Sequence, residues 1–304
     1  MNPRTVPLLY IRHLRILALL TAVALLATGC IGLEQKEREL TFRATRDDAG
    51  WYTGIPAGLS ELDLPVDTSA NAPRIHAWYW PDSDPNAPLV YYLHGARWNL
   101  TGHLNRIAQL RRMGFSVFAI DYRGFGKSDG DLPSEATAYE DARAGWRWVV
   151  AHEPDPGRRI IYGHSLGGAI AVDLAATLGR ADGARGLVVE SSFTNLAEMA
   201  SEVTHGIFPA VMLSQKFDSV GKIARIPIPV LIVHGDSDRY VPKRFSDALY
   251  AAAPSPKRLL IVPNGSHNNS LSIGNSEYHK VLVDFFDLGA SAPPPAAAMA
   301  GGHG

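Results

Sequence analysis

The chain has 304 residues, of which 46% are hydrophobic and 19% are charged, and its formal net charge is −1. This composition is typical of a globular protein that buries a sizeable core, and α/β folds of 200 to 250 residues often form one domain. The near-neutral charge, without a basic stripe, argues against nucleic acid as a partner.

The N-terminus has the features of an export signal. Basic residues, among them Arg12 and Arg15, precede an apolar run of 12 residues at Ile16–Ala27, whereas a membrane-spanning helix needs about 20. Small residues then lead to Cys30, the only cysteine in the chain. This arrangement resembles a bacterial lipoprotein signal, in which Cys30 is acylated after removal of residues 1–29. The alternatives are an ordinary signal peptide with an incidental cysteine, and an uncleaved anchor.

The same resemblance implies a location in the bacterial cell envelope. Ile31, rather than aspartate, follows Cys30, which implies the outer membrane, with the protein facing the periplasm. Residues 30–50 are polar and charged without strong periodicity, so we expect a tether there. Residues 289–304 are rich in Ala, Pro and Gly and cannot pack a core, so we expect a disordered tail. One folded domain at 51–288 is left.

Within that domain, short apolar runs alternate with helix-like stretches. Such an alternation predicts a mostly parallel sheet covered by helices on both faces, with its chemistry at the carboxyl ends of the strands. The predicted strands are Ile75–Trp80, Leu89–Leu93, Val117–Ile120, Arg159–Tyr162, Leu187–Glu190, Val230–Val233 and Leu259–Val262. The predicted helices lie at about Leu100–Met113, Ser134–Ala151, Leu166–Leu178, Lys243–Ala253 and Ser276–Phe286.

Neither a cofactor nor a metal ion is expected. Residues 126–128 (Gly-Lys-Ser) look like the end of a P-loop, but Asp121 stands where that motif needs its first glycine. Residues 124–126 (Gly-Phe-Gly) begin like a dinucleotide-binding motif, yet Asp129 occupies its third glycine position. No pair of His, Cys or Asp residues has a zinc-ligand spacing with a plausible partner.

The most informative pattern is Gly-His-Ser-Leu-Gly at 163–167. It is a G-x-S-x-G motif directly after a predicted strand and directly before a predicted helix, which is the context of a nucleophile elbow. The glycines give strand and helix room to pass closely, while the sharp turn exposes the serine. The helix N-terminus at Leu166 points N–H groups at the site, which favours a developing oxyanion. We therefore predict that Ser165 is a nucleophile.

A serine nucleophile needs a base that a carboxylate orients, and on this fold the chain order is Ser, Asp or Glu, His. Asp236 and Asp238 both follow the strand at 230–233, and periodicity does not choose between them. His267 follows the next strand in a loop, and we predict it to be the base. His279 lies in a helix-like stretch, where we expect a surface residue.

A second oxyanion donor comes from the loop after an earlier strand. His94-Gly95-Ala96 has that form, because Gly95 permits a tight turn that aims the Ala96 N–H toward Ser165. The Leu166 N–H is the other expected donor. We expect the His94 side chain to be buried and hydrogen-bonded to backbone.

Over about Trp51 to Leu288 the chain resembles the α/β-hydrolase superfamily, in particular its small membrane-associated serine hydrolases. The resemblance implies the α/β-hydrolase fold and, through a G-x-x-D-x-x-V-P pattern, Asp238 as the acid of a Ser165-Asp238-His267 triad. The span Glu190–Pro227 leaves room for only a small helical cap. The matching motifs are His94-Gly95, DYRGFGKS at 121–128, GHSLGG at 163–168, ESSFT at 190–194, Gly235 to Pro242, and GSHN at 265–268.

The substrate is less well defined than the fold, because esterases, lipases, thioesterases, amidases and peptidases share this fold. A membrane-tethered protein with an open apolar cleft favours acyl esters, such as short- or medium-chain esters, lysophospholipids, monoacylglycerols or protein thioesters. The alternatives are an amidase or peptidase of the same fold, and a non-catalytic lipid-anchored binding protein. The oligomeric state is open.

Overall fold

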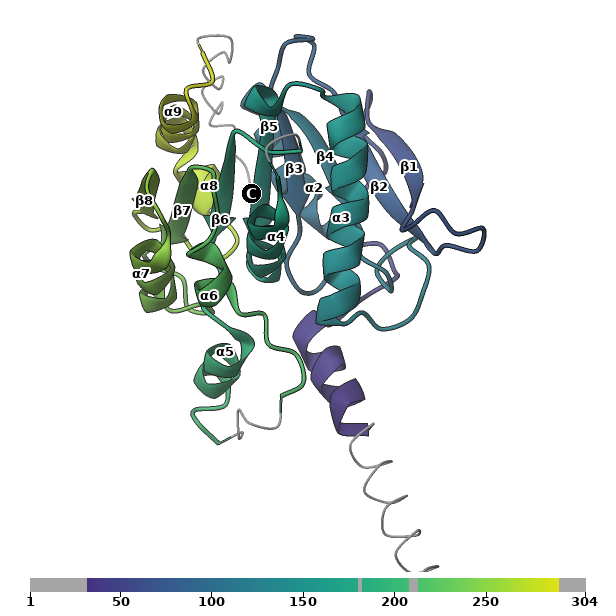
Figure 1. Ribbon diagram of the computed structural model, residues 1–304, viewed down its shortest axis with the longest axis vertical. Helices are drawn as coiled ribbons and strands as arrows, with labels where there is room; N and C mark the ends of the chain where they lie inside the picture. The colour runs from purple at the N-terminus through teal and green to yellow at the C-terminus, as the bar shows by residue number, and fades with distance from the viewer. Residues whose placement is uncertain (1–31, 180–181, 208–212, 290–304) are drawn as a thin grey trace, which may run out of the picture.

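A computed structural model describes residues 32–179, 182–207 and 213–289 (Figure 1). Its centre is an eight-stranded sheet in the order β1-β2-β4-β3-β5-β6-β7-β8. β2 pairs antiparallel with β1 and β4, and the other neighbouring strands are parallel, as predicted. The strands are β1 (Ser60–Pro65), β2 (Arg74–Trp80), β3 (Leu89–Leu93), β4 (Ser116–Ile120), β5 (Arg159–His164), β6 (Gly186–Glu190), β7 (Val230–Gly235) and β8 (Lys257–Val262).

Helices cover both faces of this sheet (Figure 1). The five strands from β3 to β7 are buried along their whole length, which is why they are continuous apolar runs in the sequence. One face carries α3 (Glu135–His152), α4 (Leu166–Thr177), α6 (Ser219–Ile223) and α7 (Lys243–Ala252); the other carries α2 (Leu100–Arg112), α8 (Ser270–Ile273) and α9 (Asn275–Phe286). The short η1 (Pro156–Arg158) precedes β5.

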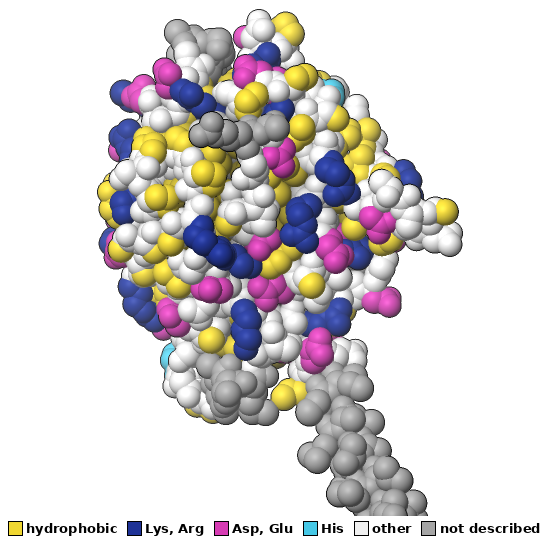
Figure 2. Space-filling model, viewed as in Figure 1, with side chains coloured by type: hydrophobic (Ala, Val, Ile, Leu, Met, Phe, Trp, Pro, Cys, Tyr) yellow, Lys and Arg dark blue, Asp and Glu magenta, His cyan; other side chains and the backbone are white. Residues whose placement is uncertain are grey.

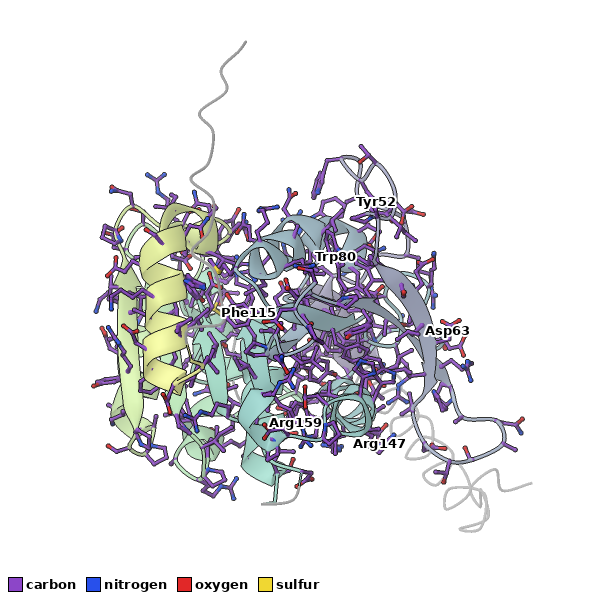
Figure 3. All side chains as sticks on the ribbon, turned by 90° about the horizontal axis from the view of Figure 1, so that it is seen from above. Tyr52, Asp63, Trp80, Phe115, Arg147 and Arg159 are labelled. Carbon is purple, nitrogen blue, oxygen red and sulfur yellow. The ribbon has the colours of Figure 1, made fainter. Side chains whose placement is uncertain are left out.

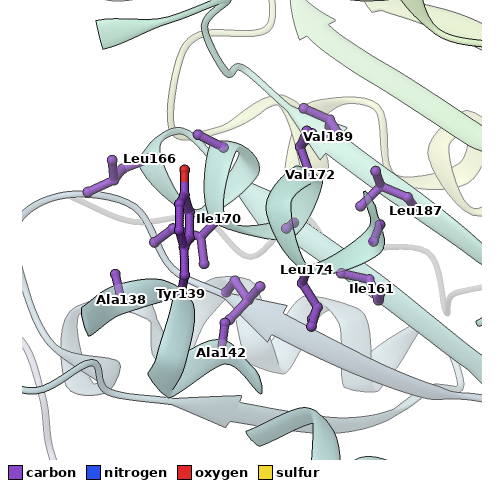
Figure 4. Packing of buried hydrophobic residues seen from close by; sticks show 14 of the residues in the cluster. Ala138, Tyr139, Ala142, Ile161, Leu166, Ile170, Val172, Leu174, Leu187 and Val189 are labelled. Atoms are coloured by element: carbon purple, nitrogen blue, oxygen red, sulfur yellow. The ribbon is translucent and has the colours of Figure 1, made fainter. Parts of the chain in front are cut away.

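The core around α4 fixes the helix that begins directly after Ser165. Tyr139 of α3 lies beside Leu166 and Ile170 of α4 in the packing of Figure 4. Almost every residue of α4 is buried, because the helix lies between the sheet, α3 and α6. Each large apolar side chain buried there, such as Ile170, stabilises the fold by about 1.5–3 kcal/mol. Ser165 thus directly precedes a helix that the core holds in place through its buried residues.

β1 is a strand that the sequence patterns did not predict. It pairs only with β2 at the edge of the sheet, and its side chains are exposed or half-buried. Asp63 lies on this outer strand in Figure 3. The strand prediction rested on apolar runs, and an exposed edge strand with acidic residues has no such run.

The prediction of a tether at residues 30–50 is wrong for the residues that the structure describes. Residues 32–42 are helical and lie beside the lower end of α3 in Figure 1. Glu37 and Phe42 are buried, at 8% and 0% exposed. Because most other side chains of this helix face solvent, its apolar periodicity is too weak to mark a packed helix.

Two other predicted segments lie outside the described residues. These are the signal peptide at 1–29 together with Cys30, and residues 290–304 of the predicted tail. Among the described helices, none is long and apolar enough to cross a membrane.

The surface has mixed charge and a small helical cap. Basic and acidic side chains are interspersed over the face that Figure 2 shows. The cap region contains α5 (Leu196–Val203), which agrees with the short helix expected there. At its end, Val203 and Ile207 are 60% and 85% exposed. The cap therefore presents large apolar side chains to its surroundings.

Candidate active site

Ser165 stands in the turn between β5 and α4 with φ 56° and ψ −121°. A positive φ is uncommon for a residue other than glycine and persists only where the surrounding structure holds it. The Ser165 N–H donates to Glu190 O (2.9 Å), and Ser192 Oγ donates to Ser165 O (2.8 Å). Both partners come from the end of β6 and the loop after it. The neighbouring strand therefore holds the strained turn.

The glycines around Ser165 have the steric role that the sequence predicts. A Cβ on Gly163 would lie 2.2 Å from Gly167 O, and one on Gly167 would lie 2.0 Å from Leu93 O. Side-chain carbons do not approach backbone oxygens so closely, so only glycine fits either position. On the facing loop, a Cβ on Gly95 would lie 3.1 Å from Ser165 Cβ. Gly95 thus allows that loop to lie directly against the serine.

His267 connects Ser165 to Asp238. Its Nδ1 lies 2.8 Å from Asp238 Oδ2, and its Nε2 lies 3.1 Å from Ser165 Oγ. Asp238 Oδ1 accepts the N–H groups of Tyr240 (2.8 Å) and Val241 (3.0 Å). Burial opposes ionisation of Asp238, but the hydrogen bond and charge of His267 and the two backbone donors lower its pKa below the usual value. An ionised Asp238 holds the imidazole with its proton on Nδ1 and leaves Nε2 free to take a proton.

Asp236, the other candidate acid, hydrogen-bonds loop residues instead of His267. Its Oδ1 accepts the Asn264 N–H (2.7 Å) and the Ser237 hydroxyl (3.0 Å). The side chain is exposed and ties the loop after β7 to the loop after β8. The structure therefore gives the two aspartates different partners: Asp238 contacts His267, and Asp236 contacts the loop after β8. Sequence periodicity does not distinguish them.

Three further histidines, His94, His164 and His279, are buried, and none of them lies between Ser165 and Asp238. His164 Nε2 lies 2.8 Å from His267 O, and burial lowers the pKa of His164 well below its usual value, so it is neutral. His94 is buried, with Nδ1 2.8 Å from Gly95 O, as expected. His279 is also buried rather than on the surface as expected, and burial lowers its pKa.

The two predicted oxyanion donors lie next to this turn. Leu166 is the first residue of α4, so its N–H has no acceptor within the helix. Ala96 directly follows Gly95, whose close approach to Ser165 is described above. Across the described ranges, neither the Ala96 nor the Leu166 N–H donates to another protein group. Two such donors beside a nucleophile suit a negatively charged oxygen.

A buried ion pair contacts the loop that carries His267, and no pattern in the sequence predicts this pair. Arg106 of α2 contacts the Glu190 carboxylate at the end of β6, and Arg106 Nη2 donates to Asn268 O (3.2 Å). Burial opposes the charge on Arg106, but Glu190 raises its pKa well above the usual value. Arg106 is 84 residues from Glu190 in the chain. No local pattern joins them, so only the folded arrangement identifies the pair.

A pocket of about 310 Å³ opens beside His267. Tyr240 is 64% exposed, and its ring centroid lies 5.5 Å from that of His267. Arg239 is exposed and has no ion-pair partner within the described part of the chain. The pocket lies between the loops after β7 and β8, and it is lined by residues of polar type: Ser237, Arg239, Tyr240, Ser266, His267 and Asn268.

The fold and the site together define an α/β-hydrolase. Residues 84–220 match the family model Hydrolase_4, described as serine aminopeptidase, S33. The chain is 33% identical over 228 residues to the uncharacterized protein YfhR of Escherichia coli (strain K12), which covers 72% of this chain and 78% of YfhR. The chain therefore belongs to the α/β-hydrolase family, as its motifs predict.

Two further similarities support this placement. Lysophosphatidylserine lipase ABHD12 of Danio rerio is 30% identical over 225 residues, which cover 69% of this chain and 56% of ABHD12. An α/β-hydrolase structure from Vibrio vulnificus has a TM-score of 0.67 at 20% identity, covering 83% of this chain and 92% of that one. At this identity the structural likeness shows the fold alone.

Proposed function

We propose that the protein is a serine hydrolase that cleaves acyl esters, of the carboxylesterase, lysophospholipase or acyl-thioesterase type. The observation that carries the proposal is the chain of two short contacts from Asp238 through His267 to Ser165, at 2.8 and 3.1 Å. A hydroxyl with a base in hydrogen-bonding reach, and a carboxylate that orients the base, is the arrangement that activates a serine.

The proposed reaction runs through an acyl-enzyme. Ser165 Oγ attacks the ester carbonyl while His267 Nε2 accepts its proton, and the N–H groups of Ala96 and Leu166 stabilise the oxyanion. His267 then protonates the leaving alcohol as the C–O bond breaks, which leaves the acyl group on Ser165. Water attacks this ester with His267 as base, the carboxylic acid departs, and Ser165 recovers its proton.

The pocket beside His267 lies on the leaving-group side of the proposed site, because His267 delivers a proton to that group. Its lining residues include hydrogen-bonding side chains, and Arg239 supplies a positive charge that has no counter-ion in the described residues. An alcohol that carries an anionic head group fits this pocket better than a neutral or cationic alcohol. The relative ABHD12 is a lysophosphatidylserine lipase, and lysophosphatidylserine is an anionic lysophospholipid.

Two other functions remain as alternatives. The name of the matching family model, serine aminopeptidase, favours an amidase or peptidase of the same fold. A non-catalytic lipid-anchored binding protein would use the fold without the chemistry.

We also propose that lipid on Cys30 anchors the protein to the cell envelope, in the outer membrane facing the periplasm.

Substitution of the nucleophile tests the reaction. Ser165→Ala is expected to fold, because Ser165 lies in a turn and adds little to the core. It should lower kcat for p-nitrophenyl butyrate by about 10⁶ and abolish labelling by a fluorophosphonate. A panel of esters, thioesters and aminoacyl anilides then separates esterase from amidase. Near wild-type hydrolysis by Ser165→Ala would contradict the mechanism, and a wild-type chain that is not labelled would support the binding protein.

The two aspartates provide a matched pair of variants. Asp238→Asn keeps the shape but favours the wrong imidazole tautomer, so kcat should fall by about 10⁴. Asp236→Asn should cost mainly loop stability, about 1 kcal/mol, with the activity of the folded protein largely kept. Measuring kcat and thermal melting for both variants decides the assignment. A larger catalytic loss in Asp236→Asn than in Asp238→Asn would show that the acid is wrongly assigned.

The leaving-group pocket predicts a dependence on head-group charge. Arg239→Gln should lower kcat/KM for a lysophosphatidylserine about fivefold, as expected for a partly exposed charge pair. It should leave the monoacylglycerol with the same acyl chain unchanged. Arg239→Lys is the control that keeps the charge, and added salt should reduce the difference. An equal loss on both substrates would argue against an anionic head group in this pocket.

The proposed anchor is tested by partitioning. Wild-type protein should enter the detergent phase, and mass spectrometry should identify an acylated cysteine as its N-terminal residue. Cys30→Ser should yield unlipidated protein, either as an uncleaved precursor or in soluble form. A mature wild-type chain without lipid that starts at another residue would disprove the anchor.

A further inference from the structure

We propose that residues 37–49 position the oxyanion loop and the cap of the active site, so that the segment tunes catalysis as well as stability. We call this segment the N-terminal clasp. This inference rests on the proposed hydrolase function, because the loop and the cap matter through the reaction at Ser165. The clasp itself contributes no side chain to the triad; it acts through the oxyanion loop and the cap segment that it contacts.

The clasp first contacts the oxyanion loop, residues 94–98. The Arg97 N–H donates to Phe42 O (2.9 Å). Arg97 and Trp98 have φ values of 66° and 56°, two consecutive left-handed conformations that residues other than glycine adopt rarely. Such a loop needs an external partner to keep its shape. Phe42 supplies that partner one residue after Ala96, the predicted oxyanion donor.

Further bonds fix the end of the clasp to the start of α2. Asn99 Nδ2 donates to Asp47 O (2.9 Å), and the Ala49 N–H donates to Thr101 Oγ1 (2.9 Å). Asn99 and Thr101 are both buried. The clasp therefore binds the chain at two points on the C-terminal side of Ala96, one within the oxyanion loop and one directly after it.

The clasp also contacts Ser214 and Gln215, which follow the cap helix α5 in the chain. The carboxylate of Glu37 accepts three hydrogen bonds, from Ser214 N (2.8 Å), Ser214 Oγ (2.7 Å) and Gln215 N (2.7 Å). Glu37 is only 8% exposed, so these donors replace most of its water. A buried carboxylate satisfied by neutral donors is a directional contact that an amide cannot reproduce, because an amide nitrogen would face a backbone N–H.

An aromatic contact links the clasp to the surroundings of Ser165. The fully buried rings of Phe42 and Phe217 meet edge to face, 5.9 Å apart. Phe217 in turn meets Phe193 at 6.4 Å. Phe193 follows Ser192, whose hydroxyl holds Ser165 O. The contacts of Phe42 therefore run from the oxyanion loop on one side to the nucleophile turn on the other.

These contacts predict a catalytic effect that a purely structural segment would not have. Displacement of catalytic groups by about 1 Å can cost 10²-fold in rate even when the substitution is distant. A loosened clasp should therefore reduce the rate of the chemical step in folded enzyme. Substrate binding should change less, because no residue of the clasp lines the pocket beside His267.

The test uses the full chain with Glu37→Gln, and Glu39→Gln as the matched control. Glu39 lies on the same helix, but its side chain is 41% exposed and accepts hydrogen bonds from Gln35 and Lys36 of that helix. Active sites are counted by fluorophosphonate titration, and kinetics are measured with p-nitrophenyl butyrate well below the melting temperature. Glu37→Gln should lower kcat per active serine about tenfold, with KM changed less than twofold. Glu39→Gln should match wild type.

A second variant, Phe42→Leu, covers the case in which Glu37→Gln does not fold. It should lower kcat per active serine and accelerate amide hydrogen exchange at Arg97. Unchanged kcat per active serine in the folded variants, with only a lower melting temperature, would overturn the proposal. If wild-type protein is neither labelled nor active, the proposed hydrolase function fails; exchange at Arg97 unchanged by Phe42→Leu would separately show that the clasp does not hold the loop.

Discussion

The site depends on one steric constraint, the close approach of backbone at the turn that holds Ser165. With Gly163 and Gly167, β5, α4 and the end of β3 come so close that a Cβ at either glycine would lie within 2.2 Å of a carbonyl oxygen. This closeness lets the serine occupy a strained, partly exposed position while its helix stays in the core. Packing therefore requires the two glycines of the motif, whereas the proposed chemistry requires the serine between them.

Electrostatics then fixes the groups around the turn. The low pKa of Asp238 keeps a negative charge against His267, and neutral His164 and charged Arg106 hold successive carbonyls of the His267 loop from below. Burying Arg106 with Glu190 is costly unless the geometry is good, so such a pair contributes more to the position of the loop than to net stability. The ring of His267 is thus oriented by the charge of Asp238, while neutral His164 contacts the carbonyl of His267 itself and charged Arg106 the next one.

The sequence predicted what local patterns encode. Apolar runs identified the buried strands, and G-x-S-x-G identified the nucleophile turn, because each is determined by neighbours in the chain. Three features could not be predicted from such patterns, because each depends on partners distant in the sequence. They are the acidic edge strand β1, the ion pair of Arg106 with Glu190, and the packed helix at 32–42. The choice of Asp238 over Asp236 required a family pattern, since a turn has no periodicity.

The clasp places the proposed anchor and the proposed chemistry close together. The helix at 32–42 has 11 residues and spans about 16 Å, from a point two residues after Cys30 to the carbonyl that holds the oxyanion loop. Two residues reach at most about 7 Å. With lipid on Cys30, the site would therefore lie near the membrane surface, where the exposed Val203 and Ile207 of the cap could contact acyl chains. Such a geometry favours substrates taken from the leaflet over substrates that diffuse freely.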